Sequence, residues 1–96
     1  HGVIAEEGSR IAALMGLHIT VNSTHHQGVA DAGSLSVTAR AEHDGLIEAV
    51  ERSDLRFCIG VQWHPELSPG TAHDALFSGL VVAARERHAS LLAAQA

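Results

Sequence analysis

A histidine and a glutamate stand two positions apart at the end of an apolar run. The run Phe57–Trp63 leads directly into His64, Pro65 and Glu66. Alternate side chains of an extended chain share a face, with backbones about 7 Å apart, so the carboxylate of Glu66 can reach the imidazole of His64. Pro65 lacks an N–H and disfavours a helical backbone at His64, so pairing should stop here and leave both side chains at a strand exit. An imidazole oriented by a carboxylate supplies two members of a nucleophilic catalytic triad.

The third member of such a triad, the nucleophile, has no well-placed candidate. Cys58 is the only cysteine, and six residues of strand would hold it roughly 20 Å from His64, whereas a thiol–imidazole contact needs about 3 Å. Ser23 is the nearest alternative, but it is flanked by Asn22 and Thr24 and lacks the Gly-x-Ser-x-Gly context of a nucleophile elbow. We therefore interpret Cys58 as a small apolar residue of a strand and expect the nucleophile to lie outside this chain.

A polar loop forms a second concentration of reactive side chains. The stretch Leu17–Ser23 alternates apolar and polar residues as a half-buried strand does, and Asn22–Gly28 then brings polar side chains that include two adjacent histidines. Loops that follow strands are where α/β proteins place their sites. The same composition is also typical of a solvated or capping turn, and at this point both interpretations stay open.

Two other classes of function compete with the triad. Zinc could take three or four ligands from His25, His26, His64 and Glu66. Adjacent histidines at a strand exit tend to diverge, and the zinc deaminase signature that contains His-x-Glu also needs a Pro-Cys-x-x-Cys that this sequence lacks. We favour chemistry without a metal. The other competitor is a non-catalytic scaffold or regulatory role, which the missing nucleophile makes a real alternative.

Composition excludes several classes of partner. The chain has 96 residues, a net charge of −5 and no lysine, whereas nucleic acids and anionic membranes select basic surfaces. One cysteine cannot form an internal disulfide, and no apolar run approaches the ~20 residues of a membrane span. We expect a cytoplasmic protein with neither a nucleic acid nor a membrane as partner. The start at His1 suggests a processed, truncated or incompletely represented polypeptide.

Several elements must position the candidate residues. Ser9 and Gly16 are expected to cap a brief helix. A β-hairpin is predicted from Leu35–Glu42 through an Asp-Gly turn into Leu46–Val50, and it leads to a strand over Phe57–Trp63 that is too apolar for an open sheet edge.

A long helix is predicted from about Ala72 into the nineties, capped by Thr71. Three histidines, His18, His73 and His88, are expected to lie on the surface. The apolar residues at helical spacing predict the buried stripe of this helix: Leu76, Phe77, Leu80, Val81, Ala84 and Leu91.

Four blocks of this sequence, in order, resemble those of class I glutamine amidotransferase-like hydrolases. The match is closest to the γ-glutamyl-γ-aminobutyrate hydrolase group of peptidase family C26. The blocks are Gly8–Ala12, Val21–Gln27, Asp44–Glu51 and Gly60–Glu66. The resemblance implies a flavodoxin-like α/β sandwich with a mostly parallel sheet, of which residues 1–96 would be the C-terminal portion of a single domain.

The resemblance also implies a Cys-His-Glu triad that hydrolyses a small-molecule γ-glutamyl amide without a cofactor. His64 would be the general base and Glu66 its orienting carboxylate. The nucleophilic cysteine would lie in the N-terminal portion of the same enzyme, and a homo-oligomer is left open. The residues that would lie beside the γ-glutamyl pocket are Ser23, His25, His26 and Gln27.

Overall fold

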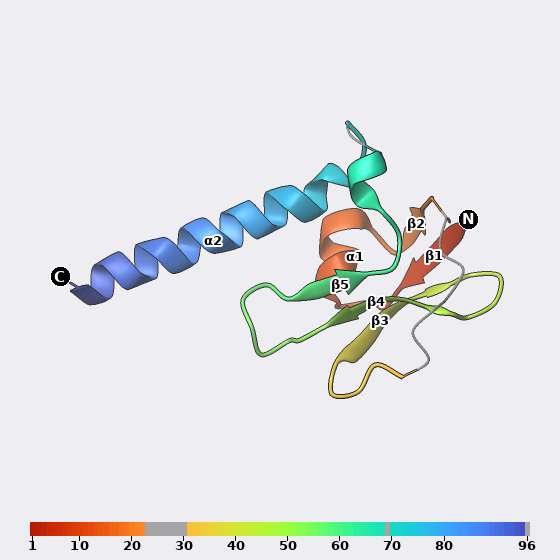
Figure 1. Ribbon diagram of the computed structural model, residues 1–96, viewed down its shortest axis with the longest axis horizontal. Helices are drawn as coiled ribbons and strands as arrows, with labels where there is room; N and C mark the ends of the chain where they lie inside the picture. Colours follow the sequence, from red (N-terminus) through yellow and green to blue (C-terminus); the bar gives the residue numbers. More distant parts are fainter. Residues whose placement is uncertain (23–30, 69, 96) are drawn as a thin grey trace.

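Five short strands form one curled sheet, with one helix beside it and a second helix that extends away from it (Figure 1). The computed structural model describes residues 1–22, 31–68 and 70–95. The strand order is β2-β1-β3-β4-β5. The elements are β1 (Gly2–Ala5), α1 (Arg10–Met15), β2 (His18–Thr20), β3 (Ser36–Ala41), β4 (Ile47–Glu51), β5 (Ile59–Val61), the 3-10 turn η1 (Pro65–Leu67) and α2 (Asp74–Gln95).

All four pairings among the described strands are antiparallel. The fold class is confirmed as mixed α/β with an antiparallel hairpin and a long C-terminal helix. The mostly parallel sheet that the resemblance implied is not found in the described part of the chain. The predicted hairpin is present as β3 and β4, and Gly45 in its turn has φ +73°, a conformation that glycine adopts without steric cost.

The alternation predicted for the first hairpin strand is interrupted. The pairing of β3 with β4 shifts register between Val37 and Ala39, so Thr38 and Ala39 are both buried. An extra residue in one strand rotates the side chains that follow it, which simple alternation cannot anticipate.

His64 and Glu66 form the candidate catalytic dyad, and the strand before this dyad differs most from prediction. In place of a buried strand over Phe57–Trp63, β5 has three residues and is an edge strand that pairs with β4 alone among the described strands. Phe57 and Cys58 precede it and are half-buried. An apolar sequence indicates that the side chains of a strand are covered. It does not indicate whether the strand has a hydrogen-bonded neighbour on each side.

The short helix α1 is capped at both ends as predicted. Ser9 Oγ accepts the Ala12 N–H at 3.1 Å, and the Gly16 N–H donates to the Ala12 carbonyl at 2.8 Å. The backbone N–H groups of the first two helix residues bond to a residue that is far away in the sequence. The Glu51 carboxyl group on β4 accepts Arg10 N–H and Ile11 N–H, each at 3.0 Å. A buried carboxyl group at the helix N-terminus therefore joins α1 to the sheet.

The core lies between the sheet and α1 and reaches the start of α2. It comprises Val3, Ala5, Ile11, Ile19, Val21, Ala39, Ala49, Trp63 and Leu76.

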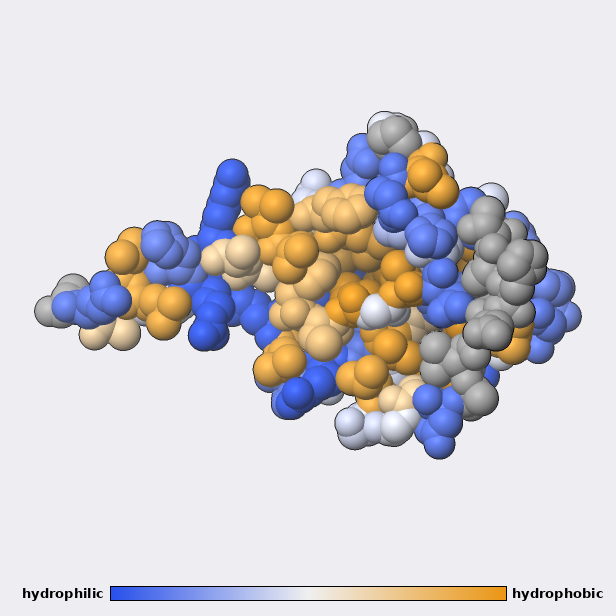
Figure 2. All heavy atoms as spheres, viewed as in Figure 1, coloured by the Kyte–Doolittle hydropathy of each residue, from blue (hydrophilic) through white to orange (hydrophobic). Residues whose placement is uncertain are grey.

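The predicted buried stripe of α2 is wrong for most of its length. Only Leu76 and Ala83 are buried on this helix, and Ala84, which was predicted to be buried, is exposed. Figure 1 shows the cause, since α2 leaves the sheet after its first turns, and the molecule measures 52 Å along its longest axis. Figure 2 shows apolar side chains continuing from α2 onto the adjoining part of the body. The large apolar residues exposed along α2 are Phe77, Leu80, Val81, Val82, Leu91 and Leu92.

The part of the chain that the structure describes contains no helix both long enough and apolar enough to span a membrane.

Candidate active site

The backbone around His64 turns because ladder pairing ends there. The last backbone hydrogen bond between β4 and β5 is donated by Gln62 N–H to the Glu48 carbonyl at 2.8 Å. Trp63 then enters the core, Pro65 has no N–H to donate, and Leu67 N–H closes the 3-10 turn on the His64 carbonyl at 3.1 Å. His64 therefore stands at the exit of β5, as the sequence predicted.

The side chains of His64 and Glu66 are in direct contact. His64 Nδ1 lies 2.7 Å from Glu66 Oε1, and the two side chains are 53% and 56% exposed. The contact does not arise from an extended backbone as expected, since Glu66 lies within η1. An ionised carboxylate can only accept, so Nδ1 donates and the lone pair of the neutral imidazole is at Nε2. The arrangement can take a proton at Nε2 and stabilise the resulting cation.

Glu66 is held in its ionised form. A hydrogen bond from its own backbone N–H and, next in size, the one from His64 keep the pKa of Glu66 below its ordinary value of 4.5. The carboxylate is therefore charged throughout the neutral and weakly acidic range, where it can orient the imidazole.

A residue missed by the sequence reasoning holds the backbone of His64. Asn22 Nδ2 donates to the His64 carbonyl at 2.9 Å, and the His64 N–H donates to Asn22 Oδ1 at 3.1 Å. Asn22 was interpreted only as a residue on the polar face of a half-buried strand and as the start of a polar loop. A partner 42 residues away leaves no signal in a single sequence.

A second connection lies in the core beneath the dyad and corrects a prediction. His73 was expected on the surface, but it is 7% exposed and precedes α2. Trp63 Nε1–H donates to His73 Nδ1 at 3.2 Å, and His73 Nε2 lies 2.9 Å from the Thr20 carbonyl. Indole nitrogen can only donate and a carbonyl can only accept, so this ring is neutral with its proton on Nε2. His18 and His88 are exposed as predicted.

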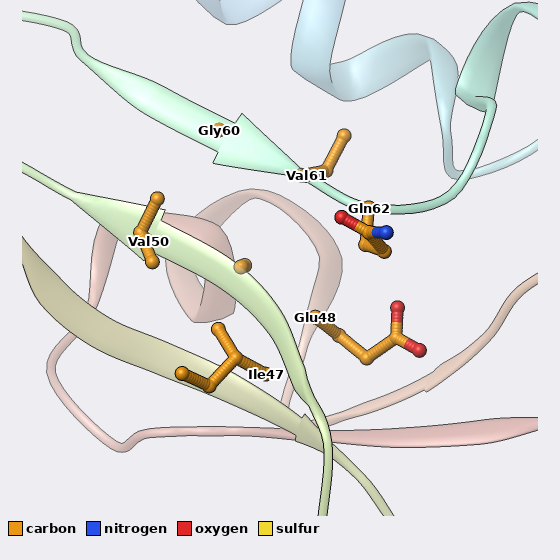
Figure 3. Close-up of a pocket in the computed structure, with 7 residues that line it drawn as sticks. Ile47, Glu48, Val50, Gly60, Val61 and Gln62 are labelled. Carbon is orange, nitrogen blue, oxygen red and sulfur yellow. The ribbon is translucent and has the colours of Figure 1, made fainter. Parts of the chain in front are cut away.

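A hollow of about 140 Å³ is lined by residues of the paired strands β4 and β5 and by Gln62, shortly before His64 in the chain (Figure 3). Figure 3 shows Glu48 and Gln62 beside each other at one end of the hollow, away from Val50 and Gly60. Glu48 is buried, and its Oε1 lies 3.0 Å from His1 Nε2. The hollow is lined mainly by apolar groups, and neither His64 nor Glu66 contributes to it.

The remaining candidate residues lie outside the described part of the chain. Ser23, His25, His26 and Gln27 belong to residues 23–30, so their relation to the dyad stays a prediction. The described residues contain no group of three or more His, Cys, Asp and Glu side chains that could hold a metal ion. The zinc alternative, which needs His25 and His26, is therefore not tested.

Comparison with known proteins decides the family. The model of the Peptidase C26 family matches residues 1–66, which ends at Glu66. The chain belongs to the Peptidase C26 family. The resemblance drawn from the four sequence blocks is thereby confirmed.

Proteins similar to this chain carry amidotransferase and hydrolase names. A glutamine amidotransferase-like protein of Rickettsia prowazekii is 48% identical over 71 residues, which cover 72% of this chain and 25% of that protein. The γ-glutamyl-γ-aminobutyrate hydrolase of Escherichia coli is 40% identical over 88 residues, covering 86% of this chain and 34% of the enzyme. A glutamine amidotransferase-like protein of Lactococcus lactis is 36% identical over 73 residues, covering 76% of this chain and 30% of that protein. The chain thus spans about a quarter to a third of the length of these relatives.

Proposed function

We propose that the protein containing this chain hydrolyses a γ-glutamyl amide through a Cys-His-Glu triad, to which this chain contributes His64 and Glu66. The observation that carries the proposal is the 2.7 Å contact between His64 Nδ1 and Glu66 Oε1, which leaves Nε2 as a proton acceptor. Membership of a family with γ-glutamyl and glutamine amidotransferase-like relatives supports the choice of substrate.

The proposed reaction uses one proton shuttle. His64 Nε2 takes the proton of the cysteine thiol, and the thiolate attacks the γ-carbonyl carbon. The proton then passes to the leaving amine as the C–N bond breaks and a γ-glutamyl thioester remains. Water, deprotonated by the same nitrogen, attacks the thioester and releases glutamate and the thiol. Proton transfer of this kind contributes about 10²–10⁴-fold to the rate. Glu66 stays ionised and stabilises the imidazolium.

The nucleophile is proposed to come from the N-terminal portion of the same enzyme. Cys58 precedes β5 whereas His64 follows it, and the Cys58 carbonyl is engaged by Arg52 N–H at 3.1 Å on the approach to that strand. An extended strand between the two residues keeps thiol and imidazole apart. Residues 1–96 would then be the C-terminal portion of one domain.

The surface that would receive the N-terminal portion is the unpaired side of β5 together with the apolar face of α2. β5 pairs only with β4 among the described strands, and the exposed apolar residues of α2 begin beside the body at Phe77. Unpaired strand edges and large apolar patches on a protein commonly mark surfaces that another segment covers.

The substrate-binding part of the proposal rests on the loop after β2. Ser23, His25, His26 and Gln27 would line the γ-glutamyl pocket, as the family resemblance implies. A cytoplasmic location and catalysis without a cofactor belong to the same proposal.

The test is an assay with a γ-glutamyl anilide. We expect no turnover by the 96-residue chain alone. Turnover should appear when the separately made N-terminal fragment is added, and it should be lost when the cysteine of that fragment is changed to alanine. Turnover by this chain alone that Cys58→Ala abolishes would overturn the proposal. Activity of neither the mixture nor the full-length protein would favour the scaffold role.

A further inference from the structure

Two strands at opposite edges of the sheet end at the same place. β2 and β5 are the outermost strands of the order β2-β1-β3-β4-β5 and do not pair with each other. Asn22 lies two residues beyond the end of β2, yet both ends of its carboxamide bond to the peptide groups of His64, beyond the end of β5. The carboxamide thus links the ends of two strands that do not pair with each other in the sheet.

The bonds from Asn22 act on a peptide segment that has little other support. The ladder to β4 ends with Gln62 N–H, and Pro65, the residue after His64, has no N–H. Asn22 Oδ1 accepts the His64 N–H, whereas the His64 carbonyl is shared between Asn22 and Leu67. Without Asn22, the backbone of His64 would keep, among the hydrogen bonds of the described residues, only the one that Leu67 N–H donates in the 3-10 turn.

The direction of His64 Nε2 follows from two separate anchors. Glu66 holds the ring at Nδ1, and Asn22 holds the backbone on which the side chain is mounted. Fixing both ends of the side chain leaves the opposite nitrogen aimed in one direction. A nucleophile–base pair requires such alignment, since a displacement of about 1 Å can cost about 10²-fold in rate.

We propose that Asn22 is a positioning residue that aims His64 Nε2 at the nucleophile by fixing the backbone of His64. The inference rests on the proposed function of His64. It assigns the residue two bonds that only a carboxamide of this length makes, because aspartate lacks the donor and glutamine is longer by one methylene.

A structural role is separable from this positioning role. The exits of β2 and β5 are also joined in the core, through the bonds from Trp63 to His73 and from His73 to the Thr20 carbonyl. That buried connection remains when Asn22 is removed. Loss of the Asn22 side chain should therefore change the geometry of His64 more than the stability of the fold.

The kinetic test uses Asn22→Ala and Asn22→Asp in the full-length protein. We expect kcat to fall about 10-fold or more for Asn22→Ala and less for Asn22→Asp, which keeps the acceptor, with KM changed less than about 2-fold. The matched control is Asp54→Ala, which also removes a short polar side chain with two hydrogen bonds, here from Arg52 at the other end of β5. Equal kcat values for the Asn22→Ala and control proteins would overturn the proposal.

A spectroscopic test does not depend on activity. With ring-¹⁵N histidine in the full-length protein, His64 should give the signals of a ring protonated at Nδ1. Asn22→Ala should shift these signals toward the average of both tautomers, and Asp54→Ala should leave them in place. Unchanged His64 signals in Asn22→Ala would contradict the positioning role. If the His64 signals shift in Asn22→Ala but the full-length protein does not hydrolyse γ-glutamyl amides, the positioning role of Asn22 is supported and the proposed function is wrong.

Discussion

Two parts of this chain differ in how they are held. The ends of β2 and β5 are fixed by hydrogen bonds and burial, whereas the distal part of α2 is exposed. At the exits, four side-chain hydrogen bonds join segments from β2, β5 and the start of α2, and Trp63 beneath them is 2% exposed. Beyond Ala83, no described residue of α2 is buried, and its leucines lie on the surface. The difference fits the proposal that the N-terminal portion of the same enzyme covers the apolar face of α2, whereas the backbone around His64 is held by bonds within this chain.

The largest effect should come from removing the side chain that anchors the exits. Trp63→Ala deletes a buried indole and leaves His73 Nδ1 without its donor, so the free energy of unfolding should fall by about 3–5 kcal/mol. Leu91→Ala in α2 is the matched substitution, and it should change the free energy of unfolding of this chain by less than about 0.5 kcal/mol. Urea unfolding of both proteins makes the measurement.

The same leucine sharpens the comparison in the full-length protein. If the N-terminal portion covers α2, Leu91→Ala should lower the free energy of unfolding there by about 1 kcal/mol or more, as substitutions of covered leucines do. An effect below that in both proteins would mean that Leu91 stays exposed and that another surface receives the N-terminal portion.

A smaller effect is expected from the histidine that connects the exits. His73→Phe keeps a ring in the core but leaves the Trp63 N–H and the Thr20 carbonyl unpaired, which should cost about 1–3 kcal/mol of unfolding free energy. His88→Phe places the same change on the exposed face of α2 and should be nearly neutral. Equal effects of the two substitutions on the thermal midpoint would show that the connection does not stabilise the fold.

The smallest expected effect is the change in stability with pH that Glu66 causes. The pKa of Glu66 is lowered first by its own backbone N–H and then by His64, so the folded chain favours the ionised carboxylate. The stabilising contribution is present above the ordinary value of 4.5 and is lost as the pH falls through the lower folded value. A ¹³C NMR titration of Glu66 should show a midpoint below 4.5.

The control for this titration is His64→Ala. Its Glu66 midpoint should rise but stay below 4.5, because the backbone donor remains. An unchanged midpoint would remove His64 as a source of the lowered pKa.

Local patterns predicted the parts of the fold that depend on neighbouring residues. Alternation found β2, with Ile19 and Val21 buried, and the Asp-Gly turn located the hairpin of β3 and β4. Caps at Ser9 and Gly16 were likewise predicted from residue type. Each depends on interactions within a few positions along the chain, which a sequence displays directly.

Contacts between distant segments could not be predicted in the same way. Polar character predicted exposure for His73, but its two hydrogen-bond partners lie 10 and 53 positions away. Glu51 stabilises α1 from 40 positions away, and Asn22 reaches His64 over 42. For the candidate site, the sequence identified His64 and Glu66 as candidates, whereas Asn22, which holds the backbone of His64, became apparent only in three dimensions.

The most direct measurement is the turnover of Glu66→Gln in the full-length protein. The amide keeps an acceptor near His64 Nδ1 but lacks the charge that stabilises the imidazolium, so kcat should fall about 10-fold or more while KM stays nearly constant. Glu7→Gln, which makes the same change at an exposed position, should keep full turnover. Unchanged turnover of Glu66→Gln would contradict the central claim that the His64–Glu66 pair is the base and its orienting carboxylate.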